Sequence, residues 1–454
     1  MESAAVTEAA IKAFERNYEA LVRQETGLIP EASISPCASL PELADVSSDC
    51  EEFDPSLLAQ TVVIKLNGGL GTSMGLQKAK SLLPVKGETT FLDITANQIL
   101  HLRAETGANV RFLLMNSFST SEDTLEHMEA YSDRDLSGAE KIELMQNQVP
   151  KIDAESLSPV AWEKNPANEW CPPGHGDLYA ALAGSGWLDT LLESGVKYAF
   201  VSNSDNLGAT LDAGLLRYFA ESDIPFLMEA TRRTQVDKKG GHLAVRNADH
   251  QMLLREVAQC PDEDLAEFQN IDKHRYFNTN SLWIRLDVLK QLLDSEGGSL
   301  PLPMIKNKKT VDPRDSESTP VIQLEIAMGA AIESFKGSGA VCVPRSRFAA
   351  VKTTSDLFAL RSDAYEQTRD GRIALVPERA GRPPVIELSD DYKMVDSLEG
   401  TGMPSLMKAD KLTISGPVRF SDGVSIVGNV SFINESGETK WIAGGSYENE
   451  EVVL

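Results

Sequence analysis

The segment from Val62 to Ser81, VVIKLNGGLGTSMGLQKAKS, constrains the fold most, because a β-branched run leads directly into a glycine-rich loop and then a lysine. A buried strand followed by such a loop is typical of a phosphate-binding turn. Without side chains, the loop backbone can bring its N–H groups against an anion, and Lys80 adds a cationic head. The loop glycines are Gly68, Gly69, Gly71 and Gly75. The pattern predicts a nucleotide as ligand.

Two common nucleotide-binding loops fit this spacing poorly. A Walker A loop has its lysine directly after the last glycine, whereas Lys80 lies five residues beyond Gly75. The glycines read GxGxxxG, one residue longer than the dinucleotide fingerprint, and the next apolar run ends at Asn116 rather than at a ribose-binding acid. An oxidoreductase of the dinucleotide-binding type is therefore disfavoured. A glycine turn without a ligand remains open from the glycines alone.

Charge and composition limit the possible partners. The chain has 454 residues, of which 42% are hydrophobic, and this is ample for two or three globular domains. The 43 basic and 68 acidic residues give a net charge of −25. Such a charge opposes binding to nucleic acid or to an anionic membrane, so neither is expected as a partner. An anionic substrate must then be held by local positive charge.

The cysteines and the first residues bear on location. The five cysteines form no CxxC pair, so neither a disulfide framework nor a zinc cluster is expected. The N-terminal MESAAVTEAA has no basic and apolar leader pattern, and no run approaches the roughly 18 apolar residues of a membrane span. A soluble cytoplasmic protein is expected.

The chain divides into three stretches. Over 1–60 we expect an amphipathic helix at 4–26, which stops before Gly27, and then a Ser-, Pro- and acid-rich connector. Over 61–375, short apolar runs alternate with helical patterns, which predicts a doubly wound α/β sheet with ligands at the carboxyl ends of its strands. Over 376–454, small apolar residues at every second position with Gly or Asp corners predict a small parallel β-helix domain.

Two loops carry candidate polar groups. Asp205 follows a buried-type strand, and a lone carboxylate there suits Mg²⁺, which takes its other oxygens from water and substrate phosphates. The alternative is a turn-forming acid without a metal. His175 lies between two glycines after two prolines, where Gly174 could donate its N–H and the imidazole could contact a hydroxyl. A passive surface histidine is the alternative.

Two further segments are candidates. FNTNSLW alternates apolar and polar residues, so Asn278 and Asn280 are expected on one strand face, where carboxamides can bind sugar hydroxyls. An exposed strand face is equally compatible. Lys352 precedes a predicted helix with Thr354 or Ser355 as N-cap, which would add a charge to an anion-favouring helix start, although an ordinary exposed lysine is the default.

Nine segments in order over about residues 60 to 360 make the chain similar to the UTP:glucose-1-phosphate uridylyltransferase (UDP-glucose pyrophosphorylase) family of eukaryotic type. The segments are KLNGGLGTSMG, MNSFSTSEDT, ELMQNQVPKI, PPGHGDLY, FVSNSDNLGAT, KKGGHLA, FNTNSLW, VIQLEIAMGAAI and VPRSRFAAVKTTSDL. The resemblance implies a nucleotidyltransferase fold, with a Rossmann-like mixed sheet flanked by helices and a C-terminal left-handed parallel β-helix.

The resemblance also implies a role for each matching residue. The expected UTP-binding residues are Leu66, Asn67, Gly68, Gly69, Lys80, Gln146, Gly174, Asp205 and Lys352, with Gln146 reading the uracil edge. The expected sugar-phosphate residues are His175, Asn203, Asn278 and Asn280. Asp205 is the expected Mg²⁺ ligand, and Lys80 and Lys352 are the expected catalytic residues that neutralise phosphate charge.

One departure from the family pattern concerns the glycine loop. Many relatives read GPKS where this chain reads KAKS, so Lys78 and Ala79 replace a glycine and a proline. The trypanosomatid-like branch has a similar Ala-Lys. Lys80 remains the expected phosphate ligand, with Lys78 as a competitor for that role.

The implied reaction joins UTP and glucose 1-phosphate to give UDP-glucose and pyrophosphate. The phosphate of glucose 1-phosphate is already an anion, with a second pKa of about 6, so no general base is required. Positioning and charge neutralisation then account for catalysis. The short β-helix that ends at GGSYENEEVVL offers little surface, so a monomer is expected.

Two rivals remain. A UDP-sugar or UDP-N-acetylhexosamine pyrophosphorylase shares the fold and chemistry, but its loop resembles LxGGxGTRLG, where this chain has Ser73 and Met74 at the Arg-Leu positions. A non-catalytic nucleotide-binding scaffold is disfavoured by the joint presence of Asp205, Lys80 and Lys352, because binding alone would tolerate their loss.

Overall fold

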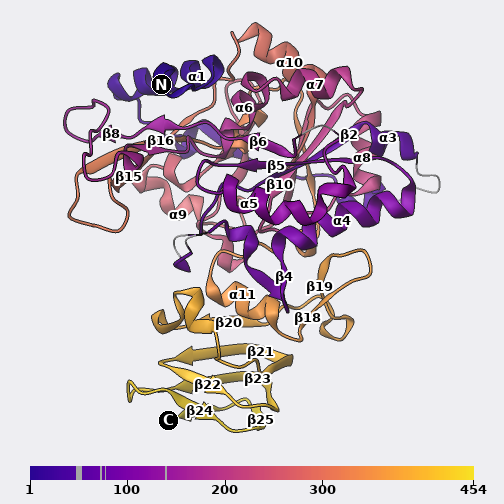
Figure 1. Cartoon of the computed structure of the whole chain (residues 1–454), viewed down its shortest axis with the longest axis vertical. Coiled ribbons are helices and arrows are strands. Elements are labelled where there is room, and N and C mark those ends of the chain that lie inside the picture. Colours follow the sequence, from indigo (N-terminus) through magenta and orange to yellow (C-terminus); the bar gives the residue numbers. More distant parts are fainter. Residues whose placement is uncertain (48–53, 72–73, 77, 139–140) are drawn as a thin grey trace.

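The computed structural model describes residues 1–47, 54–71, 74–76, 78–138 and 141–454. Cys50 and Ser73 lie outside these residues, so the comparison made at Ser73 does too. Figure 1 shows a large body of helices around a central sheet and, at the C-terminal end of the chain, a smaller stack of strands. No helix in the described residues is long and apolar enough to cross a membrane.

The central sheet is mixed, and ten strands of the described residues belong to it. Its main path runs β1-β12-β14-β10-β2-β5-β6, with β11, β13 and β17 paired beside it. The strands are β1 (Ile34–Pro36), β2 (Thr61–Leu66), β5 (Arg111–Asn116), β6 (Glu143–Met145), β10 (Tyr198–Asn203), β11 (Phe226–Arg232), β12 (His242–Arg246), β13 (Met252–Arg255), β14 (Tyr276–Arg285) and β17 (Gly339–Cys342).

The parallel part of this sheet brings three loops together. β10, β2, β5 and β6 are parallel neighbours, and Leu66 pairs with Asn203 on one side and with Met115 on the other. The residues that follow these three strands therefore emerge at one edge, as in other parallel sheets. β14 is antiparallel to both β10 and β11, which makes the sheet mixed, as the resemblance implied.

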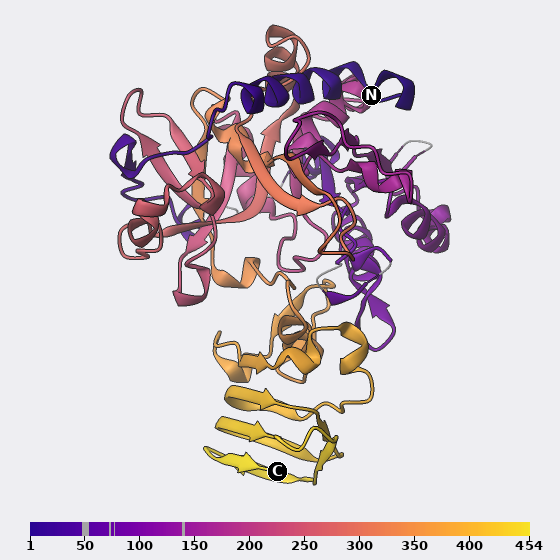
Figure 2. The ribbon, with the colours of Figure 1, turned by 90° about the vertical axis from the view of Figure 1, so that its left-hand side faces the viewer.

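Helices cover both faces of the sheet. Val62 and Ile64 of β2 pack into one hydrophobic core and Val63 into another, since neighbouring strand residues point to opposite faces. The helices are α1 (Glu8–Val22), α2 (Leu43–Ser47), α3 (Pro55–Ala59), α4 (Phe91–Thr106), α5 (Ser121–Met128), α6 (Leu178–Gly184), α7 (Trp187–Glu193), α8 (Ala213–Glu221), α9 (Leu265–Phe268), α10 (Leu286–Ser295) and α11 (Thr354–Arg361). Figure 2 shows α1 along the outer edge of the body.

The N-terminal helix is shorter than the predicted range of 4–26. α1 begins after its N-cap Thr7, whose hydroxyl accepts a hydrogen bond from the N–H of Ala10 at 3.4 Å. It ends at Val22, and Gln24 takes a left-handed conformation with φ of 58°. Gly27 is therefore not the residue that ends the helix, because Gln24 makes the turn first.

The C-terminal strands pair in parallel throughout. β20 (Val385–Leu388), β21 (Ser405–Ser415), β23 (Val424–Ile433), β25 (Gly445–Glu448) and β26 (Glu451–Val453) form one sheet, and β22 (Val418–Phe420) pairs with β24 (Lys440–Ile442). Their inner residues share a hydrophobic core with Met74 and Phe91 from near the glycine loop. A Cβ at Gly75 would lie 2.7 Å from the sulfur of Met394, so the glycine loop touches this part of the chain.

Short strands complete the fold. They are β3 (Pro84–Lys86) with β4 (Thr89–Thr90), β7 (Val149–Pro150) with β9 (Trp170–Cys171), β8 (Ile152–Asp153) with β15 (Met304–Thr310) and β16 (Pro320–Ile326), and β18 (Tyr365–Gln367) with β19 (Ile373–Leu375).

Candidate active site

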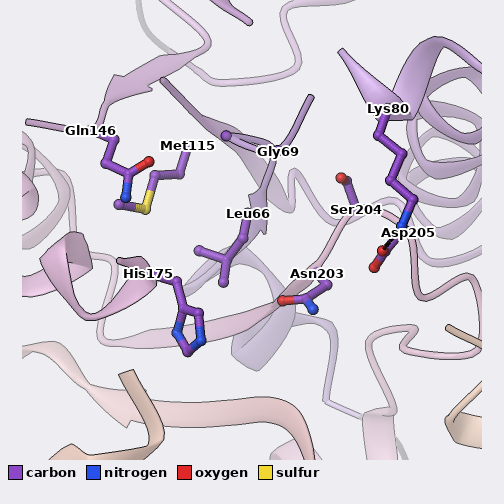
Figure 3. Close-up of a pocket in the computed structure, with 10 residues that line it drawn as sticks. Leu66, Gly69, Lys80, Met115, Gln146, His175, Asn203, Ser204 and Asp205 are labelled. Atoms are coloured by element: carbon purple, nitrogen blue, oxygen red, sulfur yellow. Dashed lines mark hydrogen bonds and ion pairs between the residues drawn. The ribbon is translucent and has the colours of Figure 1, made fainter. Parts of the chain in front are cut away.

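A cavity of about 270 Å³ opens at the edge of the sheet where β2, β5 and β10 end. Figure 3 shows Lys80 and Asp205 close to each other and Gln146 and His175 on another side of the cavity. The lining residues are Leu66, Gly68, Gly69, Lys80, Met115, Gln146, His175, Asn203, Ser204 and Asp205. The structure thus brings together eight of the residues that the sequence singled out, from loops far apart in the chain.

The glycine loop forms one wall through its backbone. A Cβ at Gly68 would lie 2.7 Å from Oε1 of Gln146, so a larger residue here would displace the Gln146 amide. Gly71 and Gly75 adopt positive φ of 66° and 79°. The Asn67 side chain is buried outside the cavity wall, where its amide donates to Oδ1 of Asn116 at 2.7 Å and ties β2 to β5.

Lys80 reaches into the cavity, and its ammonium has two partners. Nζ lies 2.6 Å from Oδ2 of Asp205 and also donates to the carbonyl of Val351. The backbone N–H of Lys80 donates to the carbonyl of Gly69 at 3.1 Å, which fixes the end of the loop. Lys78 is exposed and outside the cavity wall. Lys80 is thus the lysine that lines the cavity.

Asp205 can serve as the protein ligand of a divalent cation. Its Oδ1 is buried and has no hydrogen-bond partner among the described residues. No cluster of three or more His, Cys, Asp or Glu residues able to hold a metal occurs in the described part of the chain. A single carboxylate of this kind fits Mg²⁺, which keeps several waters and takes further oxygens from phosphates.

The loop that carries Asp205 is fixed at its base by Lys65, a residue to which the sequence assigned no role. The side chain of Lys65 is buried, and Nζ donates to Oγ of Ser202 at 2.8 Å and to the carbonyl of Ala209 at 2.7 Å. These partners lie on either side of loop 203–208. Burial lowers the pKa of Lys65 to about 7, with nearby Arg347 acting in the same direction.

Gln146 and the loop of His175 form the opposite wall. Nε2 of Gln146 donates to the carbonyl of Gly174 at 2.8 Å. Gly174 has φ of 83°, and a Cβ there would lie 2.5 Å from the carbonyl oxygen of Ile326. Glycine is therefore required at this position on two counts.

His175 presents a neutral imidazole to the cavity. Nδ1 accepts a hydrogen bond from the N–H of Met328 at 3.0 Å, so the ring proton is on Nε2. Burial lowers the pKa of His175 to about 4. The ring is therefore a hydrogen-bond donor, and not a cation, near neutral pH.

Asn203, Asn278 and Asn280 form a connected set, although only Asn203 lines the cavity. Nδ2 of Asn280 donates to Oδ1 of Asn203 at 2.9 Å, and the N–H of Asn280 donates to Oδ1 of Asn278 at 2.8 Å. Oδ1 of Asn280 is buried without a partner among the described residues.

The regular alternation expected for FNTNSLW is wrong at Asn280. β14 pairs Asn278 with Ala230 but Ser281 with Glu229, so a bulge leaves Thr279 and Asn280 outside the ladder. Asn280 has φ of 60°. The bulge, and not a period of two, sets its direction and brings its amide to Asn203.

Lys352 lies outside the cavity wall. Its ammonium lies over the rings of Phe277 and Phe348, 5.8 and 5.7 Å from their centres. The predicted N-cap at Thr354 or Ser355 is wrong, because Thr353 caps α11 in a reciprocal pair with Asp356. The carboxylate of Asp356 also accepts from the N–H of Lys352 at 2.8 Å, which moves the helix start one residue earlier.

The sequence patterns also did not indicate Glu256, a carboxylate near Lys352. Burial raises the pKa of Glu256, and the charge of Lys352 opposes that rise. A Cβ at Gly241 would lie 2.5 Å from both Glu256 oxygens. The glycine pair in KKGGHLA is the signal that could have indicated this close approach.

Comparison with known proteins gives a consistent result. Residues 11–427 match the family model described as UTP–glucose-1-phosphate uridylyltransferase. The enzyme of that name from Saccharomyces cerevisiae is 41% identical over 404 residues, which are 88% of this chain and 79% of that protein. The Solanum tuberosum enzyme is 40% identical over 409 residues, 89% of this chain and 83% of that protein.

Two solved structures extend the similarity to the whole fold. UDP-glucose phosphorylase from Trypanosoma brucei is 51% identical, with a TM-score of 0.93, and the match covers 100% of this chain and 98% of that chain. A point mutant of UDP-glucose pyrophosphorylase from Leishmania major in complex with UDP-glucose is 46% identical, with a TM-score of 0.94 and coverage of 100% and 97%.

Proposed function

Because the chain belongs to the UTP–glucose-1-phosphate uridylyltransferase family, we propose that the cavity at the end of β2 and β10 is where it transfers the uridylyl group of UTP to glucose 1-phosphate. The chain is a nucleotidyltransferase, and its products are UDP-glucose and pyrophosphate. One observation carries the assignment to this cavity: the glycine loop, the Lys80–Asp205 pair and Gln146 converge on it.

The uracil end of UTP lies against Gln146 and Gly174 in this proposal. A carboxamide offers both an acceptor and a donor, which matches the N–H and carbonyl of the uracil edge. Leu66 and the backbone of Gly68 and Gly69 line the cavity between this wall and Lys80, where the phosphates lie. The L. major relative that binds UDP-glucose supports a ligand of this kind.

The glucose 1-phosphate half lies toward His175 and Asn203. Nε2 of His175 donates to a ligand oxygen, since its other ring nitrogen is occupied by Met328. Asn203 positions the sugar phosphate, and Asn280 behind it orients the Asn203 amide toward the hexose. Asn278 supports the hexose side through its bond with Asn280.

The reaction is an in-line attack by a phosphate oxygen of glucose 1-phosphate on the α-phosphorus of UTP. The new P–O bond forms as the bond to the β-phosphate oxygen breaks, and pyrophosphate leaves with the electron pair. Lys80 moves from Asp205 to the phosphates and offsets their charge, while loop N–H groups hold the nucleotide. Mg²⁺, held by Asp205 when bound, supplies further positive charge on the phosphate oxygens.

In this proposal the Lys352 side chain leaves its two aromatic rings and moves to the phosphates when the substrates bind. Lys352 is exposed, and an exposed ammonium over a ring is held by only about 0.5–1 kcal/mol, so a polyanion can draw it away. Asn206 keeps the chain before Lys352 close to Asp205: its Oδ1 accepts from the N–H of Ala349 at 2.9 Å, and its Nδ2 donates to the carbonyl of Arg347 at 3.2 Å.

The test is pyrophosphate release with Mg²⁺ and UTP, with glucose 1-phosphate compared against galactose 1-phosphate and N-acetylglucosamine 1-phosphate. We expect the highest kcat/KM with glucose 1-phosphate. A preference for the acetylated sugar would overturn the proposal in favour of a UDP-N-acetylhexosamine pyrophosphorylase. Comparable rates with several sugars would indicate a UDP-sugar pyrophosphorylase. If no sugar phosphate led to pyrophosphate release, the protein would be a non-catalytic nucleotide-binding scaffold.

The C-terminal parallel strands form, in this proposal, a short left-handed β-helix domain over 376–454 that follows a catalytic domain over 61–375. The all-parallel pairing of β20, β21, β23 and β25 supports this. We propose a monomer, because β22, β24, β25 and β26 are three or four residues long and offer little surface to a second copy. Light scattering at several protein concentrations tests this, and a constant dimer mass would contradict it.

A further inference from the structure

Asp177 is a buried carboxylate in the turn that follows His175. It is 1% exposed, and burial raises its pKa to about 7, against hydrogen bonds from Asn147 that act in the opposite direction. None of the ion pairs among the described residues involves Asp177. A buried acid without a cationic partner costs folding free energy, which is a common sign of a functional position.

Within the described residues, every hydrogen bond that the Asp177 carboxylate accepts comes from one residue, Asn147. The backbone N–H of Asn147 donates to Oδ2 at 2.7 Å, and the Nδ2 group of Asn147 lies 3.1 Å from Oδ1 and 3.0 Å from Oδ2. A carboxylate suits this arrangement because it accepts at both oxygens and donates at neither. An asparagine at position 177 would turn its own NH₂ group toward one of these donors.

These bonds join two segments that meet at the cavity. Gln146 precedes Asn147, and its Nε2 donates to the carbonyl of Gly174, while the N–H of Asp177 donates to the same carbonyl at 3.2 Å. The strand end that carries Gln146 is therefore bound at two adjacent residues to the turn from Gly174 to Asp177. A shift of one segment must change the position of the Gln146 amide.

The direction of the Gln146 amide determines which nucleotide base can pair with it. With Nε2 on the carbonyl of Gly174, Oε1 of Gln146 is left as an acceptor and the second N–H as a donor. Uracil presents the matching donor and acceptor, whereas cytosine presents an acceptor and a donor at the same positions. A Gln146 amide fixed in this direction accepts uracil and rejects cytosine.

The N-terminal helix holds Asn147 in the required orientation. Oγ1 of Thr7, the N-cap of α1, donates to Oδ1 of Asn147 at 3.2 Å. With its oxygen on Thr7, the amide of Asn147 directs its NH₂ group at Asp177. A Cβ at Gly184 of α6 would lie 2.5 Å from the side chain of Thr7, so the contact is closely packed.

We propose that Asp177 is a positioning residue that sets the selectivity for uracil by holding Gln146 through Asn147. Asp177 touches no substrate in this account, and its effect passes through a residue whose role as base reader is itself part of the proposed function. The readout that separates positioning from a general structural role is the ratio of kcat/KM for UTP to kcat/KM for CTP. This ratio does not depend on the fraction of enzyme that is folded.

The experiment measures that ratio for the full-length enzyme and for Asp177→Asn, Asn147→Ala, Gln146→Ala and Asp153→Asn. We expect Asp177→Asn to lower it about tenfold, the size of one misplaced hydrogen bond, and Asn147→Ala to lower it in the same direction. Asp153→Asn is the matched control, because Asp153 caps the exposed turn of Glu155 and Ser156, away from the cavity. It should keep the wild-type ratio.

Coupling provides the second measurement. Because Asp177 acts through Gln146, adding Asp177→Asn to Gln146→Ala should lower the ratio no further. A wild-type ratio in both Asp177→Asn and Asn147→Ala, with a lowered ratio in Gln146→Ala, would overturn the inference and leave the proposed function intact. A wild-type ratio in Gln146→Ala would instead overturn its role as base reader, and the inference with it.

Discussion

The ammonium of Lys80 lies 2.6 Å from Oδ2 of Asp205, so the cationic and anionic groups of the site neutralise each other before any ligand arrives. Their side chains are only 15% and 18% exposed, which strengthens the attraction relative to a surface pair. Both groups are pre-positioned by this contact. A bound phosphate would give the Lys80 ammonium a second anionic partner, and the Asp205 carboxylate would then be released from Lys80.

Removing the ammonium of Lys80 should abolish most of the activity. We expect Lys80→Met to lower kcat about 10²- to 10³-fold, the usual effect of losing one group that stabilises developing charge. Pyrophosphate release at saturating UTP and glucose 1-phosphate measures this. Lys78→Met removes the same charge from an exposed position two residues away and should retain wild-type turnover. Equal losses in both variants would contradict the assignment to Lys80.

Asp205 should govern the metal requirement. Chelation by EDTA should stop the reaction of the wild-type enzyme, and added Mg²⁺ should restore it. In Asp205→Asn the Mg²⁺ concentration for half-maximal rate should rise at least about tenfold, because a neutral amide is a weaker ligand for a hard cation. The same substitution at the exposed Asp223 is the control. An unchanged Mg²⁺ dependence in Asp205→Asn would exclude it as the ligand.

Lys352 should act on turnover more than on binding. We expect Lys352→Gln to lower kcat strongly, about 10²-fold, with a much smaller rise in KM for glucose 1-phosphate, because the ammonium contacts the phosphates during transfer. Steady-state kinetics with either substrate varied will show the division. Lys336→Gln, at an exposed position, is the control. Unchanged turnover in Lys352→Gln would remove it from the catalytic residues.

The depressed pKa of His175 predicts how stability depends on pH. The folded pKa is about 4 and the ordinary value is 6.5, so the unfolded chain binds more protons between these values. The contribution of His175 to the free energy of unfolding is therefore complete above about pH 6.5 and is lost as the pH falls toward 4. Urea unfolding of the wild type and His175→Gln should show a difference that changes across this window. A difference independent of pH would contradict the depressed pKa.

Two glycines with similar φ allow a test of close packing at the site. Gly174 and Gly195 have φ of 83° and 85°, but a Cβ would lie 2.5 Å from the carbonyl oxygen of Ile326 at Gly174 and meet nothing within 4 Å at Gly195. Gly195→Ala should lower the free energy of unfolding by only about 1–2 kcal/mol, which is the cost of an alanine in a left-handed conformation. Gly174→Ala should lose more stability and should also raise KM for UTP. Equal losses of stability would show that the loop can move away.

Much of the site could be predicted because it depends on local patterns. The glycine loop follows the β-branched strand β2, Asn203 ends the buried strand β10 and Asp205 follows it, and parallel pairing brings such strand ends to one edge. The family resemblance added Gln146 and assigned His175, already a candidate from its own loop, to the same site. All of these residues line the same cavity.

The features that could not be predicted depend on tertiary contacts. The direction of Asn280 depends on a bulge, because β14 skips a position against β11. The cap of α11 falls on Thr353, since the side chain of Asp356 bonds back to it. The place of Lys352 depends on two aromatic rings, of which Phe277 comes from a distant strand and Phe348 precedes Lys352 by four residues. The bulge partner and Phe277 are far in sequence from the residues they position, so no local pattern indicates them.

The Lys80–Asp205 pair also bears on how the enzyme encounters its metal. The site has one carboxylate for a cation, already in contact with an ammonium, and the described residues hold no acidic cluster beside it. Free Mg²⁺ therefore has little to bind, whereas a metal that arrives on a triphosphate brings most of its own ligands. An enzyme of this design responds to the concentration of the metal–nucleotide complex. With Asp205 in the proposed role, its rate would follow the cellular balance between magnesium and UTP.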